Sequence, residues 1–308
     1  MKYYELEPED NHFHSVVADI THKCNMNCAN CYIPNRDIPD IDLFRLYDAI
    51  IRLPKRTWIR LIGAEPTMHP DLPEIIKTIL GYGHRVSLTT NGLKLASPAY
   101  LDSLVGAGAY YFLISMNGAD DDEVYKELDS GPYAGLKVKA LENVLKRGLT
   151  VNTGTIIAKG VNEITLQRQP ELVVEVAKKA GIRFDQNPWK RITPVLRIKS
   201  VGEIGRNMGG SRTYQMEEMI DMCKNVFGKK SNDFLKVESG LNLLKHGDGP
   251  SYTFDLDTDV GKIHIRLIDW AVDEDGVVDA GNKNRGRFTE DFKIAPFFEH
   301  VKENEFGY

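Results

Sequence analysis

Two kinds of segment alternate along most of the sequence, and this alternation limits the chain to a small set of folds. From Ser15 to about Ile192, short apolar β-rich segments alternate with segments of helical periodicity, at a spacing of roughly 25 to 35 residues. The expected strands cover residues 16–20, 58–62, 86–90, 111–116, 151–157 and 183–186. The expected helices cover residues 43–53, 72–81, 98–106, 134–147 and 165–180. Such repeated βα units predict an α/β protein with a parallel sheet.

The pattern changes beyond residue 210. A helix over residues 216–227 is followed by a strand-rich tail, with turn signals at 248–249 and 275–276 and a possible closing helix over 292–301. We therefore expect two parts. Residues 1–210 form a core of six βα units, and residues 211–308 form a C-terminal α+β extension that covers the substrate side.

Composition excludes several classes of protein. The chain has 308 residues and a formal net charge of -5, which argues against a broad nucleic-acid-binding surface. No apolar run approaches the roughly 18 residues that a bilayer-spanning helix needs. The first eleven residues are acidic and lack the apolar stretch of a signal peptide. We expect a cytoplasmic protein that binds neither membrane nor nucleic acid.

Three of the four cysteines lie within eight residues, at Cys24, Cys28 and Cys31, directly after the first expected strand. Three thiolates can bind three irons of a cubane cluster and leave the fourth iron open to an exogenous ligand. The alternative is a tetrahedral zinc site that adds a histidine such as His22. Zinc sites of this type normally use paired C-x2-C sequences, and the second pair is missing here.

Other polar segments follow the next three expected strands. Gly63-Ala64-Glu65-Pro66 follows the second strand, Thr90-Asn91 the third, and Ser115 to Gly118 the fourth. In βα architectures the carboxyl ends of the strands meet at one mouth, where binding sites form. These segments and the three cysteines are therefore expected to line one site.

The spacing CxxxCxxC after a first strand, together with the GAEP segment, resembles the radical S-adenosylmethionine (SAM) superfamily. The resemblance covers about residues 16–192 and implies a partial (β/α)6 TIM barrel. It also implies a [4Fe-4S] cluster on Cys24, Cys28 and Cys31 and SAM as the second cofactor. In that family one electron from the cluster cleaves SAM to methionine and a 5′-deoxyadenosyl radical. The alternative of another class remains a non-catalytic zinc-binding module.

The resemblance also implies which residues contact SAM. The GAEP segment corresponds to the family's GGEP element, with Ala64 where a second glycine is usual, and Asn117 stands where an aspartate is frequent. Asn30 stands just before the third cysteine, at the position of the adenine contact, where the family often has an aromatic residue or histidine. Tyr32 follows this cysteine, as is common in the peptide-modifying and natural-product branches of the family. The expected SAM-binding residues are Gly63, Ala64, Glu65, Pro66, Thr90, Asn91, Ser115, Asn117, Asn30 and Tyr32.

The substrate is less well defined by the sequence. The tail weakly resembles SPASM or Twitch extensions, but it lacks their cysteines, so no auxiliary cluster is expected. A peptide or small natural-product substrate is favoured, with epimerisation, rearrangement or ring formation as the outcome; modification of a nucleotide or sugar is the alternative. The remaining cysteine, Cys223, is a candidate hydrogen-atom donor, although a buried free cysteine is mostly a small hydrophobe. A flavodoxin- or ferredoxin-type electron donor completes the expected partners.

Overall fold

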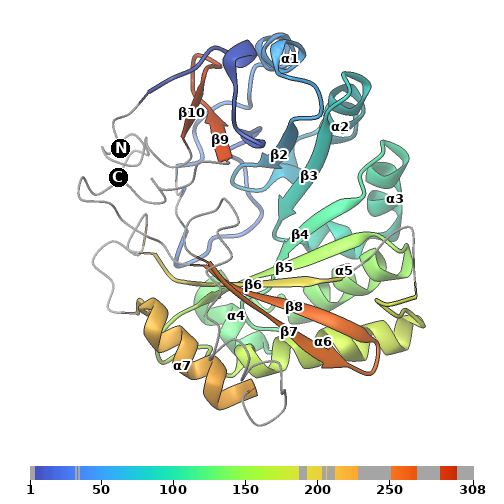
Figure 1. Ribbon diagram of the computed structural model, residues 1–308, viewed down its shortest axis with the longest axis vertical. Helices are drawn as coiled ribbons and strands as arrows, with labels where there is room; N and C mark the ends of the chain where they lie inside the picture. Colours follow the sequence, from blue (N-terminus) through green and yellow to red (C-terminus); the bar gives the residue numbers. More distant parts are fainter. Residues whose placement is uncertain are drawn as a thin grey trace.

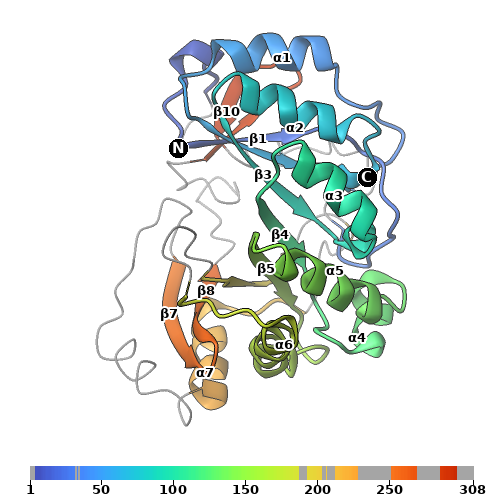
Figure 2. The same cartoon turned by 90° about the vertical axis from the view of Figure 1, so that its right-hand side faces the viewer.

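The described residues form a ten-stranded sheet at the centre of the fold. The computed structural model describes residues 4–31, 33, 35–186, 193–202, 206, 212–227, 251–268 and 285–296. The first six strands pair in parallel with their sequence neighbours: β1 (Ser15–Asp19), β2 (Trp58–Ile62), β3 (Arg85–Thr90), β4 (Tyr111–Ser115), β5 (Thr150–Ile157) and β6 (Val195–Ser200). Figures 1 and 2 show that this sheet curves, with most of the helices along its outer face. The structure therefore confirms the expected partial barrel of parallel strands.

The strands of the tail extend the same sheet at both edges. At one edge β8 (Gly261–Ile268) pairs in parallel with β6, and β7 (Ser251–Thr258) pairs antiparallel with β8. At the other edge β9 (Arg285–Phe288) pairs in parallel with β1, and β10 (Ile294–Pro296) pairs antiparallel with β9. The strand order is therefore β10-β9-β1-β2-β3-β4-β5-β6-β8-β7.

A helix follows each of the first six strands, as the βα pattern predicts. These helices are α1 (Leu43–Arg52), α2 (Leu72–Gly81), α3 (Pro98–Gly106), α4 (Asp122–Asp129) with α5 (Ala134–Lys146), α6 (Thr165–Ala180) and α7 (Met216–Phe227). Several begin at a capping residue whose side chain accepts a hydrogen bond from the first turn. Asp42 caps α1 in this way, Ser97 caps α3 and Asp121 caps α4.

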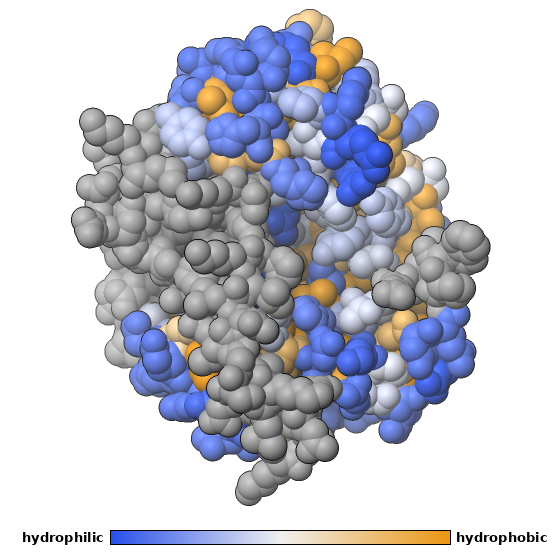
Figure 3. All heavy atoms as spheres, in the orientation of Figure 1, coloured by the Kyte–Doolittle hydropathy of each residue, from blue (hydrophilic) through white to orange (hydrophobic). Residues whose placement is uncertain are grey.

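The core lies between the sheet and the helices. Leu46 and Ile50 on α1 and Ile75 and Ile79 on α2 are fully buried, at the i and i+4 spacing of one helix face. Fully burying such a side chain contributes about 1.5–3 kcal/mol. On the face shown in Figure 3, the described surface is mostly hydrophilic, with apolar residues in small patches. No helix within the described ranges is long and apolar enough to cross a bilayer.

Three expectations about secondary structure are wrong. Residues 184–186 form a turn and a bend instead of a strand, and the sixth strand is β6. Helix α4 was not expected, because its eight residues are mostly charged and have little apolar content. Where a closing helix was expected over 292–301, residues 294–296 form β10, because they pair with β9. The turn signals at 248–249 and 275–276 lie outside the described residues.

Candidate active site

A cavity of about 250 Å³ opens where the carboxyl ends of β2, β3, β4 and β5 meet the loop after β1. Eleven of the residues expected from the sequence line it: Cys24, Cys28, Asn30, Cys31, Gly63, Ala64, Glu65, Thr90, Asn91, Ser115 and Asn117. Pro66 is buried beside the cavity and does not line it. Tyr32 lies outside the described residues. Residues from four separate segments therefore meet at this cavity, as expected from the ends of their strands.

The three cysteines lie in a loop after β1 that we call the cysteine loop, residues 24–31. All three are half-buried free thiols. The Met26 amide donates to Cys24 Sγ at 3.3 Å, and Arg36 Nη2 donates to Cys31 Sγ at 3.2 Å. Burial raises the pKa of Cys24, and burial together with the nearby Asp129 carboxylate raises the pKa of Cys28. A bound cationic metal group would offset this cost, since coordination deprotonates a thiol.

The cysteine loop is fastened to the barrel on two sides. The Ala29 amide donates to the Leu128 carbonyl at the end of α4 at 2.9 Å, and Ser130 Oγ donates to the Asn27 carbonyl at 2.7 Å. From the other side, the Arg206 amide donates to the Cys31 carbonyl at 3.0 Å. These contacts fix the path of the backbone that carries the cysteines.

The segment after β2 packs directly against the residues that precede Cys24. Gly63 has a φ of 141°, and a Cβ at this position would lie 2.3 Å from the Thr21 carbonyl oxygen. Only glycine fits such a close approach. The Ala64 amide donates to the same Thr21 carbonyl at 2.9 Å, and Ala64 is not among the residues with positive φ. Its methyl group is therefore compatible with the turn.

Glu65 is almost completely buried, and its carboxylate is already engaged by the protein. Oε1 accepts hydrogen bonds from the Thr67 amide and hydroxyl and from Thr90 Oγ1, and Oε2 accepts from the Asn91 amide at 2.6 Å. Charge-assisted hydrogen bonds of this kind are about twice as strong as neutral ones. The side chain of Glu65 therefore ties the turn after β2 to the end of β3.

Asn91 links the end of β3 to the cysteine loop, because its Nδ2 donates to Asn25 Oδ1 at 2.7 Å. Asn117, after β4, is buried and makes two side-chain hydrogen bonds. Its Nδ2 donates to Asp129 Oδ1 at 2.8 Å, and its Oδ1 accepts from the Ile156 amide at 2.9 Å. Ser115 lines the cavity, and its backbone carbonyl accepts a hydrogen bond from Lys137.

The cavity also contains a buried ion pair that was not expected from the sequence. Lys137 Nζ on α5 lies 3.4 Å from Asp129 Oδ2 on α4, and the two side chains are 0% and 2% exposed. The sequence does indicate that Lys137 is buried, because this residue falls on the apolar face of α5 with Ala134, Leu141 and Val144. A charged residue within a buried helix face needs a partner. Asp129 carried no comparable signal, since it ends the unexpected helix α4.

Cys223 lies apart from this cavity. It is buried in α7 and packs within the hydrophobic core, where burial raises the pKa of its thiol to about 12. It is not among the described residues that line the cavity. This placement favours a packing role over return of a hydrogen atom to a substrate.

Within the described ranges, no three His, Cys, Asp or Glu side chains converge as ligands of a single metal ion. The Glu65 and Asp129 carboxylates in the cavity are engaged by neighbouring side chains and amides, which leaves the three thiols as candidate ligands. In a three-cysteine cubane site each cysteine binds a different iron. The residues present therefore fit a [4Fe-4S] cluster.

Curated relatives share about 30% identity with part of the chain. A 7,8-dihydro-6-hydroxymethylpterin dimethyltransferase of Methanocaldococcus jannaschii is 30% identical over 155 residues, which cover 47% of this chain and 30% of that protein. A probable GTP 3′,8-cyclase of Aeropyrum pernix is 29% identical over 47% of this chain and 43% of its own length. The chain thus spans less than half of either relative. A probable GTP 3′,8-cyclase of Methanopyrus kandleri is 27% identical over 67% and 68% of the two chains.

Solved structures share the fold at low identity. SuiB of Streptococcus suis, bound to the precursor peptide SuiA, matches with a TM-score of 0.53 and 14% identity over 73% of this chain and 46% of its own. The protein anSMEcpe with bound AdoMet matches with a TM-score of 0.52 and 16% identity, over 72% of this chain and 61% of its own.

The family model of the radical SAM superfamily matches residues 19–183, which is more than half of the 308 residues. Members of this superfamily are enzymes that use a [4Fe-4S] cluster and SAM. Because the match covers more than half of the chain and contains the three cysteines and the segments after β2, β3 and β4 that line the cavity, the chain belongs to the radical SAM superfamily.

Proposed function

We propose that Cys24, Cys28 and Cys31 hold a single [4Fe-4S] cluster and that SAM binds beside it in the same cavity. The observation that carries this proposal is the cavity itself, which the three thiols share with Gly63, Ala64 and Glu65. When bound, the cluster supplies one electron that cleaves SAM to methionine and a 5′-deoxyadenosyl radical, which abstracts hydrogen from the substrate.

The surrounding residues bind, orient and exclude water. The lack of a side chain at Gly63 allows the backbone after β2 to pack closely against Thr21, before Cys24, on one side of the cavity. Glu65 holds Thr90 and Asn91 in place, so that these residues, with Asn30, Ser115 and Asn117, form the SAM-contacting wall. Apolar side chains such as Met26 and Ile156 complete the lining and help to exclude water from a reactive radical.

The substrate we favour is a peptide or a small natural product, with epimerisation, rearrangement or ring formation as the outcome. The peptide-bound SuiB structure shares the fold and supports this choice. We place the substrate under the extension of residues 211–308, and we assign the electron supply to a flavodoxin- or ferredoxin-type donor. Modification of a nucleotide is the second candidate, because the M. kandleri relative that matches most of this chain is a probable GTP 3′,8-cyclase.

The first experiment tests the cofactor chemistry. The protein is reconstituted without oxygen, its iron and sulfide are measured, and dithionite and SAM are added. We expect about four irons per chain and formation of 5′-deoxyadenosine. Cys31→Ala should lose both, whereas Cys223→Ala, as the matched cysteine control, should retain its iron. Full iron content in Cys31→Ala, or no deoxyadenosine from the loaded parent protein, would overturn the proposal.

The second experiment separates the two substrate classes. Candidate precursor peptides and GTP are each incubated with the loaded enzyme, SAM and dithionite, and deoxyadenosine is quantified against a reaction without substrate. A productive substrate is expected to raise the deoxyadenosine yield and to give a product of changed mass or stereochemistry. A response to GTP and to none of the peptides would favour the nucleotide alternative.

A further inference from the structure

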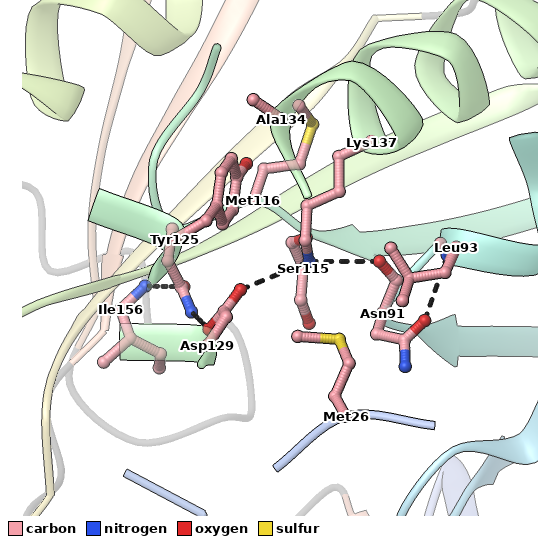
Figure 4. Close-up of polar contacts among 12 residues, drawn as sticks. Met26, Asn91, Leu93, Ser115, Met116, Tyr125, Asp129, Ala134, Lys137 and Ile156 are labelled. Carbon is pink, nitrogen blue, oxygen red and sulfur yellow. Dashed lines mark hydrogen bonds and ion pairs between the residues drawn. The ribbon is translucent and has the colours of Figure 1, made fainter. Parts of the chain in front are cut away.

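Lys137 is a fully buried lysine that approaches four groups from different parts of the barrel. Its Nζ donates to the Ser115 carbonyl at the end of β4 at 2.7 Å and to the Asn91 carbonyl after β3 at 3.1 Å. The same Nζ lies 3.4 Å from Asp129 Oδ2 and 5.1 Å from the ring centre of Tyr125. Figure 4 shows Lys137 between Asn91 and Asp129, with Met26 of the cysteine loop facing them.

On the Asp129 side, the contacts of Lys137 lead to the cysteine loop. Asp129 is the last residue of α4. Its neighbours on either side both bind the loop: the Leu128 carbonyl accepts from the Ala29 amide at 2.9 Å, and Ser130 Oγ donates to the Asn27 carbonyl at 2.7 Å. A shift of α4 would therefore move the backbone around Cys28.

On the Asn91 side, the contacts lead back to the same loop. Asn91 Nδ2 donates to Asn25 Oδ1, next to Cys24, at 2.7 Å, while the Asn91 amide donates to Glu65. The contacts thus close into what we call the polar ring, which runs through the cysteine loop, Asn91, Lys137 and the end of α4. Lys137 is the member that joins its two halves.

We propose that Lys137 is a positioning residue that holds the cysteine loop in register with the ends of β3 and β4, and so sets the geometry in which SAM binds. A lysine suits this place because its ammonium group can donate to both carbonyl oxygens, of Asn91 and Ser115, while its charge faces the Asp129 carboxylate in an ion pair. Burying two charges costs several kcal/mol per ion, which their attraction only partly offsets, so an apolar pair would pack at least as well. The pair is therefore explained by the contacts it organises. The part of this inference that concerns SAM rests on the proposed function.

The variants separate positioning from charge compensation. Lys137→Met leaves the Asp129 carboxylate buried without its ion-pair partner, and such a break is strongly destabilising. Adding Asp129→Asn removes that charge and keeps a polar group beside Asn117. The control is Lys139→Met, two residues along α5. The Lys139 side chain is 47% exposed, and its partner Glu142 keeps an ion pair with Lys146 when Lys139 is replaced.

The expected result is that the double variant recovers the melting temperature of the parent but still binds SAM about tenfold more weakly, at unchanged iron content. SAM binding is measured by anaerobic calorimetry. The control should match the parent in all three measurements. If the SAM affinity of the double variant returns to that of the parent together with its melting temperature, Lys137 serves only to balance the charge of Asp129. That result would overturn the proposal.

A second measurement needs no cofactor. It uses the double variant, so it can be made even if the single variant Lys137→Met folds poorly. Amide hydrogen exchange in the double variant without SAM should be faster across the cysteine loop and unchanged in strands β3 and β4. Unchanged exchange in the loop would refute the positioning role. If the parent protein itself failed to bind SAM, the proposed function would fail, and this exchange measurement would still decide whether Lys137 fixes the loop.

Discussion

Substitution of Gly63 by alanine gives the most direct test of how the wall of the cavity is built. The new Cβ would lie 2.3 Å from the Thr21 carbonyl oxygen and 3.2 Å from the Thr21 nitrogen. Ordinary contacts between carbon and a carbonyl oxygen are no closer than about 3.3 Å, so the two backbone segments must separate by about 1 Å. Both clashing atoms belong to the backbone, so a side-chain rotation cannot relieve the contact.

Two effects then add to the loss of stability. A φ of 141° is strained for alanine, at about 1–3 kcal/mol, and overpacking costs about 1–3 kcal/mol more. The shift also disturbs the hydrogen bond from the Ala64 amide to the Thr21 carbonyl, worth about 1 kcal/mol. We expect the melting temperature of Gly63→Ala to fall by about 5 °C or more. Each kcal/mol lost from the free energy of unfolding lowers the melting temperature by about 2–4 °C in domains of about 150–250 residues, and by a similar or smaller amount here.

The matched control is Gly135→Ala on α5, where a new Cβ meets nothing within 4 Å and φ is ordinary. Alanine in a helix stabilises by roughly 0.5–1 kcal/mol relative to glycine, so this variant should melt slightly higher than the parent. Thermal scans of both variants without cofactor give the comparison. If Gly63→Ala melts at or above the temperature of the parent, the backbone contact between Gly63 and Thr21 does not exclude a Cβ.

Three further substitutions test other parts of the molecule. Arg36→Met removes the hydrogen bond to Cys31 Sγ, which should lower the midpoint potential of the reconstituted cluster in an EPR-monitored titration; an unchanged potential would contradict a tuning role. Cys223→Ala leaves a small void in the core and should lower the melting temperature while the deoxyadenosine yield stays the same. Loss of product at unchanged deoxyadenosine yield would instead support hydrogen-atom return by this thiol. The hydrogen bond from Arg168 holds the pKa of Asp120 below its usual value. The stability that this pair contributes is therefore present above about pH 3.9, and it is lost as the pH falls through the lower pKa that Asp120 has in the folded protein. Asp120→Asn should therefore flatten the acid side of the melting-temperature profile, and an equally steep profile would contradict this assignment.

Arg45→Met serves as the control for the Arg36 experiment. The Arg45 side chain is 50% exposed and pairs with Asp291 at the surface. Loss of a surface ion pair changes stability by about 0–1 kcal/mol and should leave the midpoint potential unchanged. A similar fall in potential for both variants would indicate a general effect of net charge.

The location of the site was predictable because it depends on where strands end. Strands with strong apolar patterns, such as β2 and β4, were found from the sequence to within a residue at each end, and the segments after them were therefore correctly gathered at one mouth. The sixth strand was missed because β6 is half exposed, with Arg197 and Lys199 alternating with Leu196 and Ile198. That alternation is the signal that a search for continuous apolar runs overlooks.

The polar ring was not predictable in the same way. Asn117 and Asn91 were identified as cavity residues, but their partners depend on α4, whose short charged sequence gives little helical signal by itself. Its place comes from tertiary contacts, such as the hydrogen bond between Ala29 and Leu128. Lys137 could be recognised as unusual within the apolar face of α5, but its partner Asp129 could be identified only after the chain is folded.

The pairing of β9 with β1 has a consequence for synthesis of the chain. Strand β1 has one open edge until residues 285–288 are made, because β9 is the strand that pairs with this edge. Unpaired strand edges attract other chains. A ribosome stalled between β8 and β9 would therefore display a nascent chain with β1 uncapped, and this is the stage at which we expect the protein to depend most on chaperones.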